Sequence, residues 1–299
     1  MSNFLSVTDR TKQEFNAIID NAIELKKSYA KHRDVFKGKT LLMYFEKPST
    51  RTRLSFESGF AKLGGHPIFF TGGHISSGKE DLRDTAEMYS RFTDLVVARV
   101  YSHEALVELA RHSKIPIING LSDLEHPCQA LADLMTVKEH RGFENTTLAY
   151  IGDGNNVANS LALACAYTGV KFKIATPKGY EMSKDIAAKA KALGGNIEAF
   201  NDAKQAVQGA DFVYTDVWVS MGDEKEERQR LSAFKDYQVN GELMKIASLG
   251  AKFMHCLPAI KGKEVTAEVF SSPQSIVYDQ AENRMHAQNA LMMHLLEKH

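Results

Sequence analysis

The sequence has few cysteines and no excess of either charge, and both shortages exclude classes of protein. Its three cysteines, Cys128, Cys165 and Cys256, are odd in number and far apart. No two of them form a CxxC pair, so we expect neither a structural zinc site nor a disulfide framework. Lysine and arginine together number 37, as do aspartate and glutamate. A general basic surface for nucleic acid is therefore absent, and any anion site must be local.

Long apolar runs and nucleotide motifs are missing as well. No run approaches the roughly 18 residues of a membrane-spanning helix. The start, Met-Ser-Asn-Phe-Leu-Ser, lacks the charged end and apolar core of a signal peptide, so we expect a cytoplasmic protein. No GxxxxGK[ST] string is present, and Val157 stands where a GxGxxG pattern from Gly152 requires its last glycine. These absences argue against a P-loop and against NAD binding.

What is present is an alternation of short apolar segments with amphipathic helices. The predicted strands are Thr40–Phe45, Pro67–Phe70, Leu95–Val100, Ile115–Ile118, Thr147–Ile151, Phe172–Thr176, Ile197–Phe200, Phe212–Asp216, Phe253–Cys256 and Ser275–Tyr278. The predicted helices include Asp9–Lys31, Leu54–Leu63, His126–His140, Val157–Tyr167 and Glu282–Lys298. Such alternation indicates parallel sheets covered by helices on both faces.

We therefore predict an α/β protein with two doubly wound parallel-sheet domains, a cleft between them, and helices that bridge them. The first domain spans residues 1–140 and is completed by the C-terminal helix 282–299; the second spans residues 141–281. A cleft between two domains is a favoured place for a ligand.

The run Ser49-Thr50-Arg51-Thr52-Arg53 follows the first predicted strand and opens a helix. Helix-terminal N–H groups, hydroxyls and guanidinium groups together suit a doubly charged phosphate. The alternative is an ordinary capped helix with solvated arginines. Ligands of parallel sheets bind at the carboxyl ends of strands, which favours the phosphate.

Two further motifs contain histidine and cysteine. In His126-Pro127-Cys128-Gln129, the histidine can donate to a carbonyl oxygen and the glutamine oxygen can accept from an amide, although a plain helix start explains the string too. Cys256, in His255-Cys256-Leu257-Pro258, is either a buried thiol or a substrate contact at a strand end. Neighbours on a strand face opposite sides, so His255 is a poor base for Cys256.

Three polar positions lie at the ends of other elements. Asp216 ends a predicted strand and can hold an ammonium group. The turn Ser220-Met221-Gly222 that follows can close over a ligand. The charge run Asp223–Arg230 is interpreted as a solvated surface. Asn155 and Asn156 suit either a small polar ligand or helix capping. Arg284, in the predicted first turn of the last helix, opposes the helix dipole and is either functional or solvated.

These motifs, over the whole chain and in this order, resemble the aspartate/ornithine carbamoyltransferase family. The Ser-Met-Gly and His-Cys-Leu-Pro strings point to its ornithine branch. The resemblance implies transfer of the carbamoyl group of carbamoyl phosphate to the δ-amine of L-ornithine, giving L-citrulline and phosphate. The reaction would serve arginine biosynthesis or, in reverse, catabolism; the sequence leaves both directions open. The resemblance implies direct attack without a covalent enzyme intermediate, and neither a cofactor nor a metal. The first domain would bind carbamoyl phosphate and the second ornithine.

The resemblance also assigns residues. Those implied in catalysis are Arg51, His126, Gln129, Cys256 and Arg284. Those implied in carbamoyl phosphate binding are Ser49, Thr50, Arg51, Thr52, Arg99, His126, Gln129, Cys256, Leu257 and Arg284. Those implied in ornithine binding are Asn156, Asp216, Ser220 and Met221. The Leu257–Pro258 bond is expected to be cis.

The resemblance further implies a homotrimer in which a loop from a neighbouring subunit completes each site, with no nucleic acid or membrane partner. The glutamine that the family uses in that loop is missing from Thr71–Glu80, where His74, Ser77 or Lys79 could replace it. Other acceptors within the family, namely putrescine, N-acylated ornithine and aspartate, remain alternatives. A non-catalytic, phosphate-binding regulatory subunit is the alternative from another class.

Overall fold

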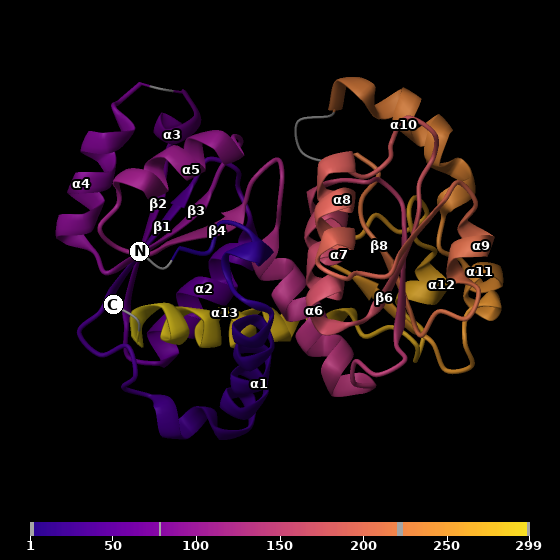
Figure 1. Cartoon of the computed structure of the whole chain (residues 1–299), viewed down its shortest axis with the longest axis horizontal. Coiled ribbons are helices and arrows are strands. Elements are labelled where there is room, and N and C mark those ends of the chain that lie inside the picture. Colours follow the sequence, from indigo (N-terminus) through magenta and orange to yellow (C-terminus); the bar gives the residue numbers. More distant parts are fainter. Residues whose placement is uncertain (1–2, 78, 220–223, 298–299) are drawn as a thin grey trace. The chain divides into compact units, whose positions relative to one another are not determined.

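The computed structural model describes residues 3–77, 79–219 and 224–297 and divides into two compact units (Figure 1). Unit 1 comprises Met1–Met135 with Glu282–His299, and unit 2 comprises Thr136–Ala281. Two helices belong to both units: α6 (Pro127–His140) and α13 (Val277–Glu297). No described helix is long and apolar enough to cross a membrane.

Unit 1 is built on a parallel sheet with strand order β2-β1-β3-β4. Its strands are β1 (Thr40–Phe45), β2 (His66–Thr71), β3 (Leu95–Arg99) and β4 (Ile117–Leu121). Its own helices are α1 (Lys12–Ser28), α2 (Thr50–Lys62), α3 (His74–Ser77), α4 (Leu82–Phe92) and α5 (His103–His112), with short 3₁₀ turns at Val7–Asp9 and Tyr29–His32.

The central strands of unit 1 are apolar because both faces of the sheet are covered. Tyr44 and Val96 pack on one face against Tyr89 of α4 and Leu106 of α5. On the other side of the unit, α13 is hydrogen-bonded to the 3₁₀ turn Tyr29–His32 that follows α1, and it approaches α2. Asn289 Nδ2 donates to Tyr29 Oη at 2.7 Å, and a β-carbon at Gly59 would lie 2.7 Å from Asn289 Oδ1.

Unit 2 is built on a parallel sheet with strand order β7-β6-β5-β8-β9. Its strands are β5 (Thr147–Ile151), β6 (Lys171–Ala175), β7 (Ile197–Phe200), β8 (Phe212–Thr215) and β9 (Lys252–His255). Its own helices are α7 (Asn156–Thr168), α8 (Lys184–Ala192), α9 (Ala203–Val207), α10 (Glu227–Phe234), α11 (Gly241–Ile246) and α12 (Ala267–Phe270), with 3₁₀ turns at Glu224–Glu226 and Lys235–Tyr237.

The two parallel sheets confirm the predicted α/β class, and each sheet is doubly wound. The strand order reverses direction between β1 and β3 in unit 1, and between β5 and β8 in unit 2. Ligands of such sheets bind outside the carboxyl ends of the strands at this reversal. The fold therefore marks one candidate position in each unit.

One predicted strand, Ser275–Tyr278, is wrong. Ser275 forms only an isolated bridge with Phe253, and α13 already begins at Val277. A short apolar run does not distinguish a strand from the first turn of a buried helix. The predicted helix Glu282–Lys298 consequently begins five residues too late, and Arg284 lies about two turns inside α13 rather than in its first turn.

Candidate active site

The reversal in unit 1 brings two of the predicted phosphate-binding segments to one edge of the sheet. Phe45, the last residue of β1, is in register with Arg99, the last residue of β3. Ser49 follows β1 as the N-cap of α2, and its Oγ accepts from the backbone N–H of Thr52 at 3.3 Å. The first turn of α2 contains no acidic residue. A helix N-terminus of this kind is suited to an anion, because its first N–H groups have no partner within the helix.

The two arginines of this motif differ in their surroundings. Arg53 is held on the surface, because its Nε donates to Glu57 at 2.7 Å and its guanidinium lies 3.9 Å from the ring centre of Phe69. Arg51 is only half-exposed in the first turn of the helix. The contacts with Glu57 and Phe69 give Arg53 a structural role on the surface.

Arg284 lies at the centre of a buried hydrogen-bond network. Its Nη2 donates to Thr52 Oγ1 at 3.0 Å and its Nη1 donates to Gln129 Oε1 at 2.6 Å. Ser49 Oγ donates to the same Thr52 hydroxyl at 3.0 Å. The interpretation of Arg284 as a solvated side chain is therefore wrong: it is 4% exposed and links α13 to α2 and α6.

His126, just before α6, is 5% exposed. Burial lowers its pKa well below the ordinary value, and the positive charges of Arg284 and Arg99 lower it further. The imidazole is therefore neutral at neutral pH, with one N–H to donate and one nitrogen to accept. Unit 1 thus gathers a neutral donor beside two guanidinium groups.

The reversal in unit 2 brings Asn155 and Asp216 together. Asn155 is the N-cap of α7, and its Oδ1 accepts from the N–H groups of Val157 and Ala158 at 2.9 and 3.2 Å. Its Nδ2 donates to Asp216 Oδ2 at 2.9 Å, directly after β8. The capping interpretation of Asn155 is correct, and the same side chain also fixes the carboxylate. Asn156 is half-exposed in the first turn of α7.

Cys256 meets the other oxygen of that carboxylate. Its Sγ donates to Asp216 Oδ1 at 3.0 Å, and the thiol is partly exposed. The neighbouring His255 is buried; its Nδ1 accepts from Leu257 N–H at 2.8 Å and its Nε2 lies 3.2 Å from Glu264 Oε1. With both ring nitrogens engaged, His255 is not placed to act as a base for Cys256. The Leu257–Pro258 bond is cis.

Asp216, His255 and Cys256 each place one potential metal-ligand atom within 4.8 Å of the other two. The thiol is hydrogen-bonded to the carboxylate, and His255 is held by Leu257 and Glu264. These contacts explain the cluster without an ion.

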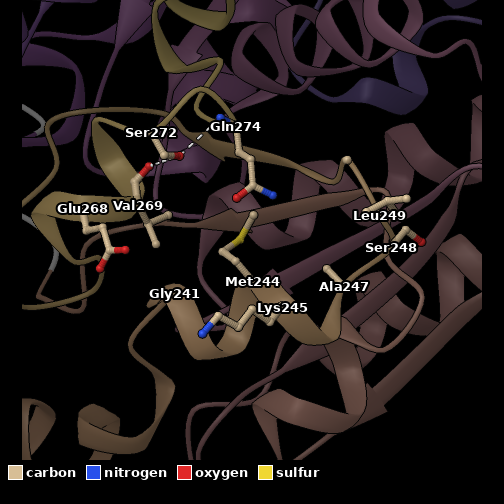
Figure 2. A pocket seen from close by; sticks show the side chains of 11 residues that line it. Gly241, Met244, Lys245, Ala247, Ser248, Leu249, Glu268, Val269, Ser272 and Gln274 are labelled. Atoms are coloured by element: carbon tan, nitrogen blue, oxygen red, sulfur yellow. Dashed lines mark hydrogen bonds between the residues drawn. The ribbon is translucent and has the colours of Figure 1, made fainter.

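Not all of the predicted site residues lie in the part of the chain that the structure describes. Ser220 and Met221 lie outside the described residues. Of the three candidates for the missing glutamine, Ser77 and Lys79 are exposed. A separate pocket of about 360 Å³ in unit 2 is lined by α11, α12, residues 247–250, Ser272 and Gln274 (Figure 2). None of the predicted site residues lines this pocket.

Comparison with known proteins decides the family. The carbamoyl-P binding domain of aspartate/ornithine carbamoyltransferase matches residues 2–139, and the Asp/Orn binding domain of the same family matches residues 144–295. The chain belongs to the aspartate/ornithine carbamoyltransferase family.

Individual carbamoyltransferases are similar over the whole length. The ornithine carbamoyltransferase of Archaeoglobus fulgidus is 48% identical over 302 residues, which cover 100% of this chain and 98% of that protein. The anabolic ornithine carbamoyltransferase of Campylobacter jejuni superposes with a TM-score of 0.94 at 38% identity, with full coverage of both chains. The Pyrococcus furiosus enzyme gives a TM-score of 0.92 at 44% identity, covering 97% of this chain and 95% of that one.

Two residues of this carbamoyltransferase fold escaped the sequence analysis. Arg230 belongs to the charge run interpreted as a solvated surface, yet it is 9% exposed and its Nη1 donates to Asp153 Oδ2 at 2.7 Å. The helical spacing carried a signal, because buried Phe234 lies four residues later on the same face. Asp133 was missed too: fully buried, it accepts from Gln129 Nε2 at 2.8 Å.

Proposed function

We propose that the chain transfers the carbamoyl group of carbamoyl phosphate to the δ-amine of L-ornithine, giving L-citrulline and phosphate. The observation that carries the proposal is the placement of two pre-formed polar sites at the two strand reversals. Unit 1 holds the Thr52–Arg284–Gln129 network beside a neutral histidine, and unit 2 holds the Asp216–Cys256 pair. The names of the relatives, ornithine carbamoyltransferases of several organisms, support the same activity.

In unit 1, the phosphate of carbamoyl phosphate would bind at the first turn of α2. Ser49, Thr50, Thr52 and the guanidinium groups of Arg51 and Arg99 supply its ligands. Thr52 Oγ1 already accepts from Ser49 and Arg284, which leaves its own proton to donate to the phosphate. Charged donors at a helix N-terminus match a dianion in both charge and geometry.

The reaction would proceed by attack of the δ-amine on the carbamoyl carbon. Negative charge then develops on the carbonyl oxygen, and neutral His126 with Arg51 and Arg284 would stabilise it. A pre-organised donor of this kind lowers the activation barrier by about 3–4 kcal/mol. The phosphate would leave as an anion neutralised by Arg51 and Arg99, and its own oxygen can take the amine proton. No step requires Cys256 to act as a nucleophile.

In unit 2, ornithine would bind through Asp216, with Asn156 and the Ser220–Met221 segment completing the site. We assign Asp216 to the α-ammonium and the Cys256 thiol to the neighbourhood of the δ-amine. A free amine of this type has a pKa of about 10.4, so the neutral nucleophile must be selected from a mostly protonated pool. Asn155 and Cys256 hold the two carboxylate oxygens in place before the substrate arrives.

We further propose that the protein is a cytoplasmic homotrimer. Large apolar side chains are exposed in unit 1, among them Phe70 on the edge strand β2 and Phe92 on α4, the latter 75% exposed. Exposed aromatic residues beside an unpaired strand edge are typical of a subunit interface. A neighbouring subunit in this position would bring its Thr71–Glu80 loop toward the phosphate.

A parallel acceptor assay tests the proposed function. Carbamoyl phosphate is offered with ornithine, putrescine, an N-acylated ornithine or aspartate, and both phosphate release and the carbamoylated product are measured. Because the other acceptors lack a partner for Asp216 or carry the wrong charge, we expect kcat/KM for ornithine to exceed theirs by about 10²-fold or more. If another acceptor gives a higher kcat/KM than ornithine, that acceptor is the substrate and the proposal for ornithine is wrong. Phosphate release with none of the amines would favour a non-catalytic regulatory subunit.

A further inference from the structure

The side-chain amide of Gln129 is held in one orientation by two partners of opposite kind. Its Nε2 donates to Asp133 Oδ1 at 2.8 Å, and its Oε1 accepts from Arg284 Nη1 at 2.6 Å. Asp133 Oδ1 is the acceptor in its contact and a guanidinium only donates, so exchanging the amide oxygen and nitrogen would break both contacts. Both partners are buried, at 0% and 4% exposure, so water does not replace them readily.

Orientation matters because the two ends of an amide recognise opposite groups. A carbamoyl group presents an NH₂ donor, and a carboxyl group in the same place presents an acceptor. An amide that directs its oxygen at the ligand favours the first, and one that directs its nitrogen favours the second. A buried polar mismatch is costly, so a fixed amide discriminates strongly between them.

We propose that Asp133 is the positioning residue through which the site selects a carbamoyl group over a carboxyl or carboxylate group. The inference rests on the proposed function, since it takes carbamoyl phosphate as the ligand beside Gln129. Asp133 lies one turn after Gln129 on α6, where residues four apart share a face. Arg284 also holds the amide, but in the proposed reaction it serves the developing oxyanion. Asp133 has no role in that reaction and can hold the side-chain NH₂ group of Gln129 throughout.

The test compares two stable phosphonates that differ at one group: phosphonoacetamide, with the carbamoyl NH₂, and phosphonoacetate, with an oxygen in its place. Their dissociation constants are measured by calorimetry on the full-length wild type and on Asp133→Asn. The asparagine has the same shape but offers either an oxygen or an NH₂ to Gln129. We expect wild type to prefer the amide ligand, and the preference to fall about tenfold in the variant, the equivalent of one hydrogen bond.

Asp94→Asn is the matched control. Asp94 accepts from Lys39 Nζ at 3.0 Å and from Thr40 N–H at 2.8 Å, at the amino ends of β1 and β3 and thus at the opposite edge of the same sheet. This variant should leave the preference unchanged even where its melting temperature falls. Asp133→Glu, which keeps a carboxylate, should retain part of the preference.

Three outcomes decide the matter. An unchanged preference in folded Asp133→Asn overturns the role of Asp133 while the proposed function stands. Failure of wild type to bind either phosphonate contradicts the carbamoyl phosphate site itself. If the variant does not fold, neutron diffraction on wild-type crystals with phosphonoacetamide locates the deuterium atoms of Gln129. Deuterium atoms directed at Asp133 support the proposal, and deuterium atoms directed at the ligand overturn it.

Discussion

The ion pair between Arg230 and Asp153 joins the two turns that carry the candidate ornithine-binding groups. Arg230 Nη1 donates to Asp153 Oδ2 at 2.7 Å and to the carbonyl oxygen of Trp218 at 3.2 Å. Asp153 lies two residues before Asn155, and Trp218 lies two residues after Asp216. The guanidinium therefore cross-links the turn after β5 to the turn after β8, next to the contact between Asn155 and Asp216.

The size of the effect follows from burial. Both side chains of the pair are 11% exposed, so removing one partner leaves a charge that water scarcely reaches. Such a loss costs about 3–5 kcal/mol, whereas replacing both partners costs much less. We expect Arg230→Met to lower the free energy of unfolding of unit 2 by about 3 kcal/mol or more, and addition of Asp153→Asn to restore about 1–3 kcal/mol of it. Glu226, 3.3 Å from Arg230 Nε, is 56% exposed and contributes little.

The double-mutant cycle of Arg230→Met and Asp153→Asn also has a kinetic readout. Loosening the two turns misplaces Asp216, so we expect KM for ornithine to rise about tenfold or more in Arg230→Met, with KM for carbamoyl phosphate nearly unchanged. Urea unfolding followed by circular dichroism gives the stabilities, and steady-state assays give both constants. Exposed Arg228, in the same helix, provides the control variant Arg228→Met. Additive free energies in the cycle, or an equal rise of both KM values, would refute the cross-link.

Two other perturbations test the sites of the two units separately. A β-carbon at Gly154 would lie 2.2 Å from Met182 N and 2.4 Å from Glu181 C, so Gly154→Ala must move backbone beside Asn155. We expect the variant to lose about 1–3 kcal/mol of unfolding free energy and to have a lower kcat/KM for ornithine. Wild-type kinetics in this variant would contradict the expectation. Because folding lowers the pKa of His126 below its ordinary value, the unfolded chain takes up that proton first as pH falls. The free energy of unfolding should therefore decline below about pH 6.5, by up to about 1.4 kcal/mol per pH unit until the folded pKa is reached, and less steeply in His126→Gln. Equal slopes for the two proteins between pH 6.5 and 5 would show that His126 does not titrate in this way.

The sequence was sufficient to predict most of the fold because its strands are short apolar runs that alternate with helices. Parallel strands place their carboxyl ends on one edge, so residues that follow β1 and β3, or β5 and β8, could be expected to meet. Two contacts of this kind are found: β1 and β3 end in register at Phe45 and Arg99, and Asn155 bonds Asp216. The prediction failed at Ser275–Tyr278, where four apolar-rich residues carry no period that separates a strand from a helix start.

The partners of the site residues were beyond prediction for a different reason. Whether Arg230 is solvated or buried depends on Asp153, which lies 77 residues earlier in the chain. Whether Arg284 is functional or solvated depends on Thr52 and Gln129, 232 and 155 residues away. A local pattern reports the residue type at one position, but the pairing that gives an arginine its role exists only after the chain has folded.

The partners of the site residues separate two functions: binding a phosphate, and selecting the groups that react. A helix start with Ser49 and Arg51 is enough to attract a phosphate, since free N–H groups and charge require no particular neighbour. Selecting the carbamoyl group and holding an amine requires fixed orientation, and each group in question is held by a second side chain: Gln129 by Asp133, and Asp216 by Asn155. Because these contacts exist before any substrate binds, their ordering cost is met during folding rather than during the reaction. A chain that kept the phosphate motif but lost Asp133 and Asn155 should therefore still bind phosphate, yet choose poorly among donors and acceptors.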